Sequence, residues 1–148
     1  MQTTGSFQVR RDRGTVWAFF ADAKELVDCL DDPHTVEVVD EAHFFGTLKT
    51  GVSFIRGTFN VNGEYIERRP PDRLAASLHG TGLGSGVDFL LAIDLKETAT
   101  GTNADWNADL TFHGPIAGIG QSLIQRSVDK MANSLFENAR RKLEGNPG

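Results

Sequence analysis

The histidines and the cysteine are the residues of this 148-residue chain best suited to bind a metal. The histidines are His34, His43, His79 and His113, and Cys29 is the one cysteine. No two histidines have the spacing of two ligands on one helix face, and a single cysteine cannot build a cysteine-based zinc site. We therefore predict no metal and interpret the histidines as surface or strand-end residues. His113 precedes a helical segment directly, so it could lie at the mouth of a cavity.

Acid–base or nucleophilic chemistry would need groups that converge on one site. The sequence contains no nucleophile elbow and no Ser, His and Asp order with a supporting motif. Asp88 and Asp94 share one face of an alternating segment, but that face is the polar one, and Arg56 also alternates outward. Tyr65 is the one hydroxyl on the apolar face, where it could hydrogen-bond the polar end of a ligand or reach solvent. We predict no catalytic residue.

The glycine-rich run GTGLGSG at residues 80–86 resembles a phosphate-binding loop only superficially. It matches neither the dinucleotide fingerprint nor the P-loop. Both of those motifs open a helix whose N-terminus binds the phosphate, and a strand-like segment follows here instead. We interpret the run as a bulged hairpin or a mobile rim of a cavity.

Charge and composition limit the classes of partner. The net charge is −5 and no basic cluster extends beyond the end of the last helix, which argues against nucleic acid. The single cysteine is typical of a reducing compartment, no apolar run approaches the roughly 18 residues of a membrane span, and the N-terminus lacks a secretory signal. We expect a cytoplasmic protein with one domain over residues 1–148, flexible at 1–4 and 144–148, and with no cofactor.

The longest element is a predicted helix over residues 114–143. Pro115 suits its first position, and three cations, Arg140 to Lys142, complement the dipole at its end. Its apolar residues recur at steps of three and four, which places them on one stripe. They are Ile116, Ile119, Leu123, Ile124, Val128, Met131, Ala132, Leu135, Phe136, Ala139 and Leu143.

The residues before this helix alternate with a period of two, which is typical of an antiparallel sheet with one wet face. We expect strands over residues 5–10, 35–40, 43–50, 52–68, 74–81, 87–96 and 103–113, and two short helices, one capped by Asp12 and one over 23–30. Seven strands can curl around the long helix. A gap between a curved sheet and a straight helix would form an apolar cavity.

The cavity would be lined by the inward residues of the sheet and of the helix. On the sheet these are Phe59, Val61, Phe89, Leu91, Trp106, Leu110 and Phe112, and on the helix Ile116, Gly120, Ile124 and Val128. The alternative is that they pack to native density and leave no room. Gly118 and Gly120 cost a helix about 2 kcal/mol relative to alanine. This cost favours either a close approach to a strand or an opening to the cavity, which we expect between the helix and Trp106, Leu110 and Phe89.

Several motifs spread along the chain resemble one known family. They are GSFQV, TVWAFFADAKELVDCL, GTF, ERRPPDRL, GTGLGSG and TNADWNADLTFHGPIAGIGQSLIQRSVDKMANSLFENARRKL. The pattern resembles the START-like (SRPBCC) superfamily and, within it, the CoxG family, named for the CoxG subunit of carbon monoxide dehydrogenase. The resemblance implies an α+β helix-grip fold, with a seven-stranded curved antiparallel sheet wrapped around a long C-terminal helix.

The resemblance also implies a function. It suggests an accessory factor of a molybdenum hydroxylase of the CO dehydrogenase type, or a carrier of an apolar small molecule that is lipid- or quinone-like. Transient membrane contact is expected for such a carrier.

Two alternatives remain open. A polyketide cyclase/aromatase-type enzyme on the same fold would place two or more ionisable groups with shifted pKa values in the cavity, and the inward face carries almost none. A protein-binding adaptor with a filled core would need an exposed apolar patch, to which Phe45, Phe54 or Leu90 could contribute.

Overall fold

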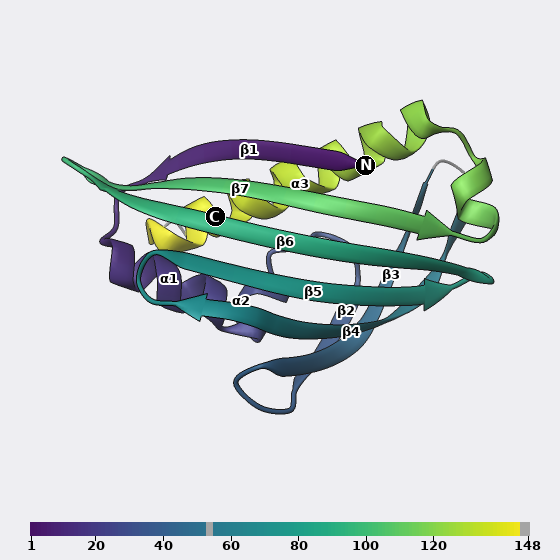
Figure 1. The fold of residues 1–148 in the computed structure, drawn as a ribbon, viewed down its shortest axis with the longest axis horizontal. Coiled ribbons are helices and arrows are strands. Elements are labelled where there is room, and N and C mark those ends of the chain that lie inside the picture. The colour runs from purple at the N-terminus through teal and green to yellow at the C-terminus, as the bar shows by residue number, and fades with distance from the viewer. Residues whose placement is uncertain (53–54, 146–148) are drawn as a thin grey trace.

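A computed structural model of the chain describes residues 1–52 and 55–145, and it confirms the predicted α+β fold (Figure 1). The strands are β1 Gln2–Val9, β2 His34–Val38, β3 His43–Val52, β4 Ile55–Arg69, β5 Arg73–Gly82, β6 Ser85–Thr98 and β7 Gly101–His113. They form one antiparallel sheet in the order β1-β7-β6-β5-β4-β3-β2. The helices are α1 Arg13–Ala21, α2 Ala23–Val27 and α3 Gln121–Leu143, with a 3₁₀ turn η1 at Pro115–Gly118.

The alternation of the sequence decides which face of the sheet is covered. In β7, Trp106 and Leu110 are buried while Asn107 and Asp109 are exposed. All three α-helices lie on the buried face, with α3 behind β7 and β6 in Figure 1. The register of β4 with β5 shifts between Tyr65 and Glu67, and a bulge of this kind bends its strand. The curved sheet therefore partly encloses the helices.

The first strand begins three residues earlier in the chain than we predicted. β1 begins at Gln2 and pairs with β7 along its whole length, and the amino group of Met1 donates to the carbonyl oxygen of Leu110 at 3.1 Å. Residues 2–4, which we expected to belong to a flexible end, are therefore part of a strand. Residues 146–148 of the other predicted flexible end lie outside the described residues.

The predicted continuous helix over residues 114–143 is wrong, because the chain bends at Gly120 between η1 and α3. Gly120 has a φ of +119°, a conformation that a side chain disfavours. A Cβ at Gly118 or Gly120 would meet nothing within 4 Å, so neither glycine permits a close approach to a strand. Gly120 serves the bend, and the helical periodicity continues across it without revealing it.

The glycine-rich run forms a tight hairpin between β5 and β6. Gly82 pairs with Ser85, and the two turn residues, Leu83 and Gly84, have φ values of 55° and 71°. Two positive φ values in a two-residue loop are the geometry that matches the twist of a hairpin. The β5–β6 register continues without a shift, so the hairpin is not bulged. Ser85 also accepts a hydrogen bond from the backbone N–H of Ile116 at 3.0 Å, which holds η1 against the hairpin.

One half of the interior is solidly packed with aromatic rings. The Trp106 ring stacks on Phe136 of α3 with a centroid distance of 4.5 Å, and Phe7 and Phe20 lie 5.7 and 6.0 Å from Phe136. Opposite Trp106, a Cβ at Gly5 would come within 2.5 Å of the indole ring. The expectation of an opening between the helix and Trp106 is therefore wrong.

Tyr65 belongs to this packed half. Its hydroxyl is buried and donates to the carbonyl oxygen of Phe20 at 2.7 Å. Burial raises the pKa of the phenol above its usual range, with a smaller opposing influence from Arg68. The hydroxyl anchors α1 to β4, so both roles considered for it, contact with a ligand or with solvent, are wrong.

Cys29 should be chemically inert in the folded protein. Its side chain is fully buried, and burial raises the pKa of the thiol from 9.0 to about 11. At pH 8 we expect iodoacetamide to modify native Cys29 about 100-fold more slowly than in denaturing urea, because the reactive thiolate is scarcer by that factor. Mass spectrometry of timed, quenched samples measures both rates. Equal rates would mean that the α2 region opens readily.

Candidate ligand pocket

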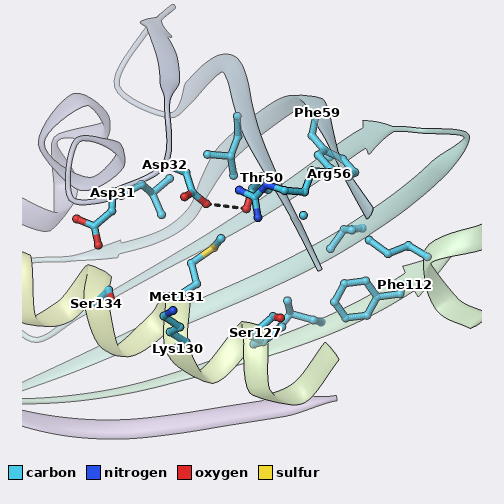
Figure 2. Close-up of a pocket in the computed structure, with 18 residues that line it drawn as sticks. Asp31, Asp32, Thr50, Arg56, Phe59, Phe112, Ser127, Lys130, Met131 and Ser134 are labelled. Atoms are coloured by element: carbon cyan, nitrogen blue, oxygen red, sulfur yellow. Dashed lines mark hydrogen bonds between the residues drawn. The ribbon is translucent and has the colours of Figure 1, made fainter. Parts of the chain in front are cut away.

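A pocket of about 570 Å³ lies between α3 and the other half of the sheet (Figure 2). Its lining comes from three parts of the chain. The loop after α2 contributes Leu30, Asp31 and Asp32; the sheet and η1 contribute Leu48, Thr50, Gly51, Arg56, Phe59, Gly80, Val87, Leu110, Phe112 and Ile116; α3 contributes Ser127, Val128, Lys130, Met131 and Ser134.

The space remains open in part because several of the facing side chains are short or absent. α3 presents Ser127, Met131 and Ser134 at helical spacing on one side. Ser127 and Ser134 have short side chains. Phe136, on the same helix, instead fills space in the packed half. Across the pocket, Gly51 and Gly80 contribute no side chain at all. The interior volume that aromatic rings fill beside Trp106 is left vacant here.

Hydrogen bonds hold the loop after α2 as a wall of the pocket. The Asn138 amide of α3 donates to the carbonyl oxygen of Cys29 at 2.8 Å and to a carboxylate oxygen of Asp31 at 2.9 Å. On the other side, the Thr50 hydroxyl of β3 donates to the Asp32 carboxylate at 2.6 Å. The loop therefore links the helix to the sheet across the end of the pocket.

His34 braces the same loop from behind. Its ring nitrogens lie 2.7 Å from the carbonyl oxygen of Asp32 and 2.9 Å from the carboxylate of Asp28. The Asp28 carboxylate also accepts from Lys24 at 2.6 Å. Hydrogen bonds from Lys24, and secondly from His34, lower the pKa of Asp28. These contacts fix the loop and give His34 a structural role.

Five of the eleven residues predicted for the cavity line the pocket: Phe59, Leu110, Phe112, Ile116 and Val128. Leu91 and Trp106 lie in the packed half, and Phe89 packs against it. Ile124 is buried with Phe59 and Ile116 in a small cluster, against which Val61 packs, and Gly120 is exposed. The open space is displaced from the centre of the sheet toward β3 and β4, because Phe136 fills the position over Trp106.

The charged residues of the lining were missed. Asp31 and Asp32 belong to a loop, where periodicity carries no information, and Arg56 was predicted to point outward because it alternates with the apolar residues of β4. Figure 2 shows the Arg56 side chain extending toward Thr50 within the pocket. The paired carboxylates before Pro33 are the one signal in the sequence that could have indicated a polar wall.

His113 lies on the outer face of the sheet, so the expectation that it borders the cavity is wrong. Its ring nitrogen is 2.9 Å from the Asp88 carboxylate, which His79 contacts at 2.6 Å. Hydrogen bonds from these two rings, His79 first, lower the pKa of Asp88. Within the described residues, no group of three His, Cys, Asp or Glu side chains is arranged to hold a metal ion.

Two exposed apolar residues of the outer face, Phe45 and Leu90, lie among polar neighbours. Phe45 and Leu90 are each 43% exposed. Phe45 pairs with Glu37 and Asn62, and Leu90 pairs with Ser77 and Asp109. Phe54 lies outside the described residues. This arrangement gives the adaptor hypothesis little support.

No helix in the described part of the chain has both the length and the apolar composition needed to cross a bilayer.

Comparison with known proteins identifies one family and one fold. The family described as the CoxG subunit of carbon monoxide dehydrogenase matches residues 5–144. No curated protein matches the chain. Among solved structures, a conserved protein of Geobacillus kaustophilus is 19% identical with a TM-score of 0.88, over 98% of this chain and 96% of that one. A protein of Thermus thermophilus is 12% identical with a TM-score of 0.72, over all of both chains. At these identities the two structures show a shared fold.

Proposed function

Because the chain belongs to the CoxG family of carbon monoxide dehydrogenase, we propose that it is a non-catalytic accessory protein that binds an apolar small molecule, lipid- or quinone-like, and serves a molybdenum hydroxylase of the CO dehydrogenase type. The pocket between α3 and the sheet is the observation that supports binding of a ligand. Its volume of about 570 Å³ falls in the range of sites that bind one drug-sized molecule.

The apolar part of the pocket supplies the driving force for binding. Phe59, Leu110 and Ile116 are buried around it, and Phe112 is half-buried at its wall. Each CH₂ group that a ligand transfers from water to such a surface is worth about 0.8 kcal/mol. A chain or ring of several carbons therefore gains affinity without any specific polar contact.

We propose a membrane as the source of the ligand. A lipid- or quinone-like molecule resides in a membrane, so the protein would contact a membrane transiently, take up the molecule and return to the cytoplasm. The protein would then exchange the molecule with an enzyme of the carbon monoxide dehydrogenase type, after which the family is named.

Extraction of the purified protein tests the ligand directly. The protein is expressed, purified in the presence of membranes and extracted with organic solvent, and the extract is analysed by mass spectrometry. We expect an apolar molecule in an amount comparable to that of the protein. A parallel extraction of an unrelated protein of similar size controls for adhering lipid. Recovery of no apolar molecule from any membrane-containing preparation would contradict the carrier.

One observation favours an enzyme of the polyketide cyclase/aromatase type as a second candidate. Four ionisable side chains, Asp31, Asp32, Arg56 and Lys130, belong to the lining, where an enzyme needs acid and base groups. Incubation of the extracted molecule with the protein separates the candidates. A carrier returns the molecule with its mass and fragmentation pattern unchanged, whereas a cyclase converts it.

A further inference from the structure

The pocket is polarised along its length. Figure 2 shows Phe59 and Phe112 toward one end, while Asp31, Asp32 and Lys130 lie toward the other. The apolar end is completed by Leu110 and Ile116, which are buried. An occupant that is apolar throughout would make no use of the cations at the charged end. The lining therefore matches a molecule with a long apolar part and one polar head.

The two cations of the pocket have no ion-pair partner among the described residues. Arg56 and Lys130 are exposed at its rim, and neither takes part in a salt bridge or a side-chain hydrogen bond within the part of the chain that the structure describes. Some other arginines are paired with carboxylates. Arg73 contacts the carboxylates of Glu67 and Asp94 at 2.8 and 2.7 Å, and Arg140 contacts Glu137 and Glu144.

The two carboxylates of the pocket, in contrast, are engaged by the protein itself. Asp32 accepts from Thr50 at 2.6 Å and Asp31 accepts from Asn138 at 2.9 Å. These bonds hold both acids on the wall formed by the loop after α2. A negatively charged head would be repelled from that wall and attracted to the cations of β4 and α3.

A guanidinium group and an ammonium group at the edge of an apolar space suit an anionic head. Arginine matches a carboxylate with two parallel hydrogen bonds, and such charge-assisted bonds are about twice as strong as neutral ones. We propose that the pocket selects a single-chain amphiphile with an anionic head, of the long-chain carboxylate class, whose head lies between Arg56 and Lys130 and whose chain lies against Phe59 and Phe112. This inference rests on the proposed function and narrows the lipid- or quinone-like ligand to an acidic lipid.

The test is displacement of a neutral fluorescent dye, Nile red, from the purified protein. Dodecanoate, 1-dodecanol and a neutral short-chain quinone compete with the dye at pH 8, where the carboxyl group is ionised. We expect dodecanoate to bind about tenfold more tightly than the alcohol, because a hydrogen bond to a charged group is worth about 1.5 kcal/mol or more. The difference should shrink as salt is added.

Variants that remove one positive charge show which residues cause the preference for dodecanoate. Arg56→Gln and Lys130→Gln should each reduce the ratio of dodecanoate affinity to alcohol affinity severalfold. Lys96→Gln is the matched control, since Lys96 is exposed on β6 and does not line the pocket. It removes the same charge and should retain the preference.

The results can distinguish failure of the anionic head from failure of ligand binding as a whole. Equal displacement by the acid and the alcohol, tighter binding of the quinone, or a preference that survives both pocket substitutions would overturn the anionic head and leave an apolar ligand standing. Failure of every competitor to displace the dye, or failure of the dye to bind, would overturn the proposed ligand and this inference together.

Discussion

Replacing Phe136 with alanine is expected to lower the free energy of unfolding by about 3–5 kcal/mol, the loss typical of a large aromatic side chain in a packed core. Phe136 is 5% exposed and stacks on Trp106 at 4.5 Å. It also joins Phe7 of β1 and Phe20 of α1 to α3. Its removal leaves a cavity at the point where four elements, β1, β7, α1 and α3, meet. Urea unfolding, followed by tryptophan fluorescence and circular dichroism, measures the change.

Phe112→Ala is the matched control for this substitution. Phe112 is also a phenylalanine, but it is half-buried and one side of it borders the pocket. Because the ring already faces open space, its removal should cost only about 1–2 kcal/mol of transfer free energy. Equal losses for the two variants would contradict the division of the interior into a packed half and an open half.

Alternation predicted the sheet because it follows directly from the pleat. Residues two apart share a face, so a run such as Ala104, Trp106, Ala108 and Leu110 identifies both a strand and its buried side. Strand ends were less accurate, since pairing with a neighbour extends a strand beyond its alternating part. β1 gains residues 2–4 in this way, from hydrogen bonding to β7 that its own composition does not indicate.

The break before α3 shows what a periodic pattern leaves out. Ile116 and Ile124 keep the apolar stripe continuous, so the pattern reads as one helix through Gly120. The glycine was expected to serve either a close approach to a strand or an opening to the cavity. In the structure it supplies a positive φ, a backbone property that a count of apolar residues does not contain.

The position of the pocket depends on side-chain volumes on two elements that are far apart in sequence. The candidates were spread over the whole inward face, because periodicity says which side chains meet and not whether they fill the space between them. Phe136 meets Trp106 and fills it. Nine residues earlier on α3, Ser127 lines the pocket, to which the sheet contributes Gly80. Only the register of helix against sheet separates the two cases.

The charged end of the pocket depends on a loop and a strand end. Asp31 and Asp32 reach the lining because Asn138 and Thr50 hold their loop across the gap between α3 and β3. Both bonds join residues at least 18 positions apart, and no local pattern predicts them. The same contacts that complete the wall therefore give the pocket the polarity on which ligand selection is proposed to rest.

Met131→Trp is expected to abolish uptake of the apolar ligand while the fold is retained. Met131 lies on the middle of α3, lines the pocket and is half-buried, so an indole ring there would extend into the open space. The affinity for Nile red should fall by about tenfold or more, because the ring occupies volume that the ligand needs. The free energy of unfolding should change by less than about 1 kcal/mol, since the added ring fills a void and displaces no packed neighbour.

The position of the tryptophan on α3 determines whether the variant reports on the pocket or on core packing. Ile124→Trp would not serve, because Ile124 is 3% exposed in the cluster with Phe59 and Ile116, and overpacking there costs about 1–3 kcal/mol. Leu123→Trp is the control, since Leu123 is 41% exposed on α3 and does not line the pocket. Dye titrations and urea unfolding of both variants give binding and stability side by side. Undiminished binding by folded Met131→Trp would place the ligand outside the space between α3 and the sheet.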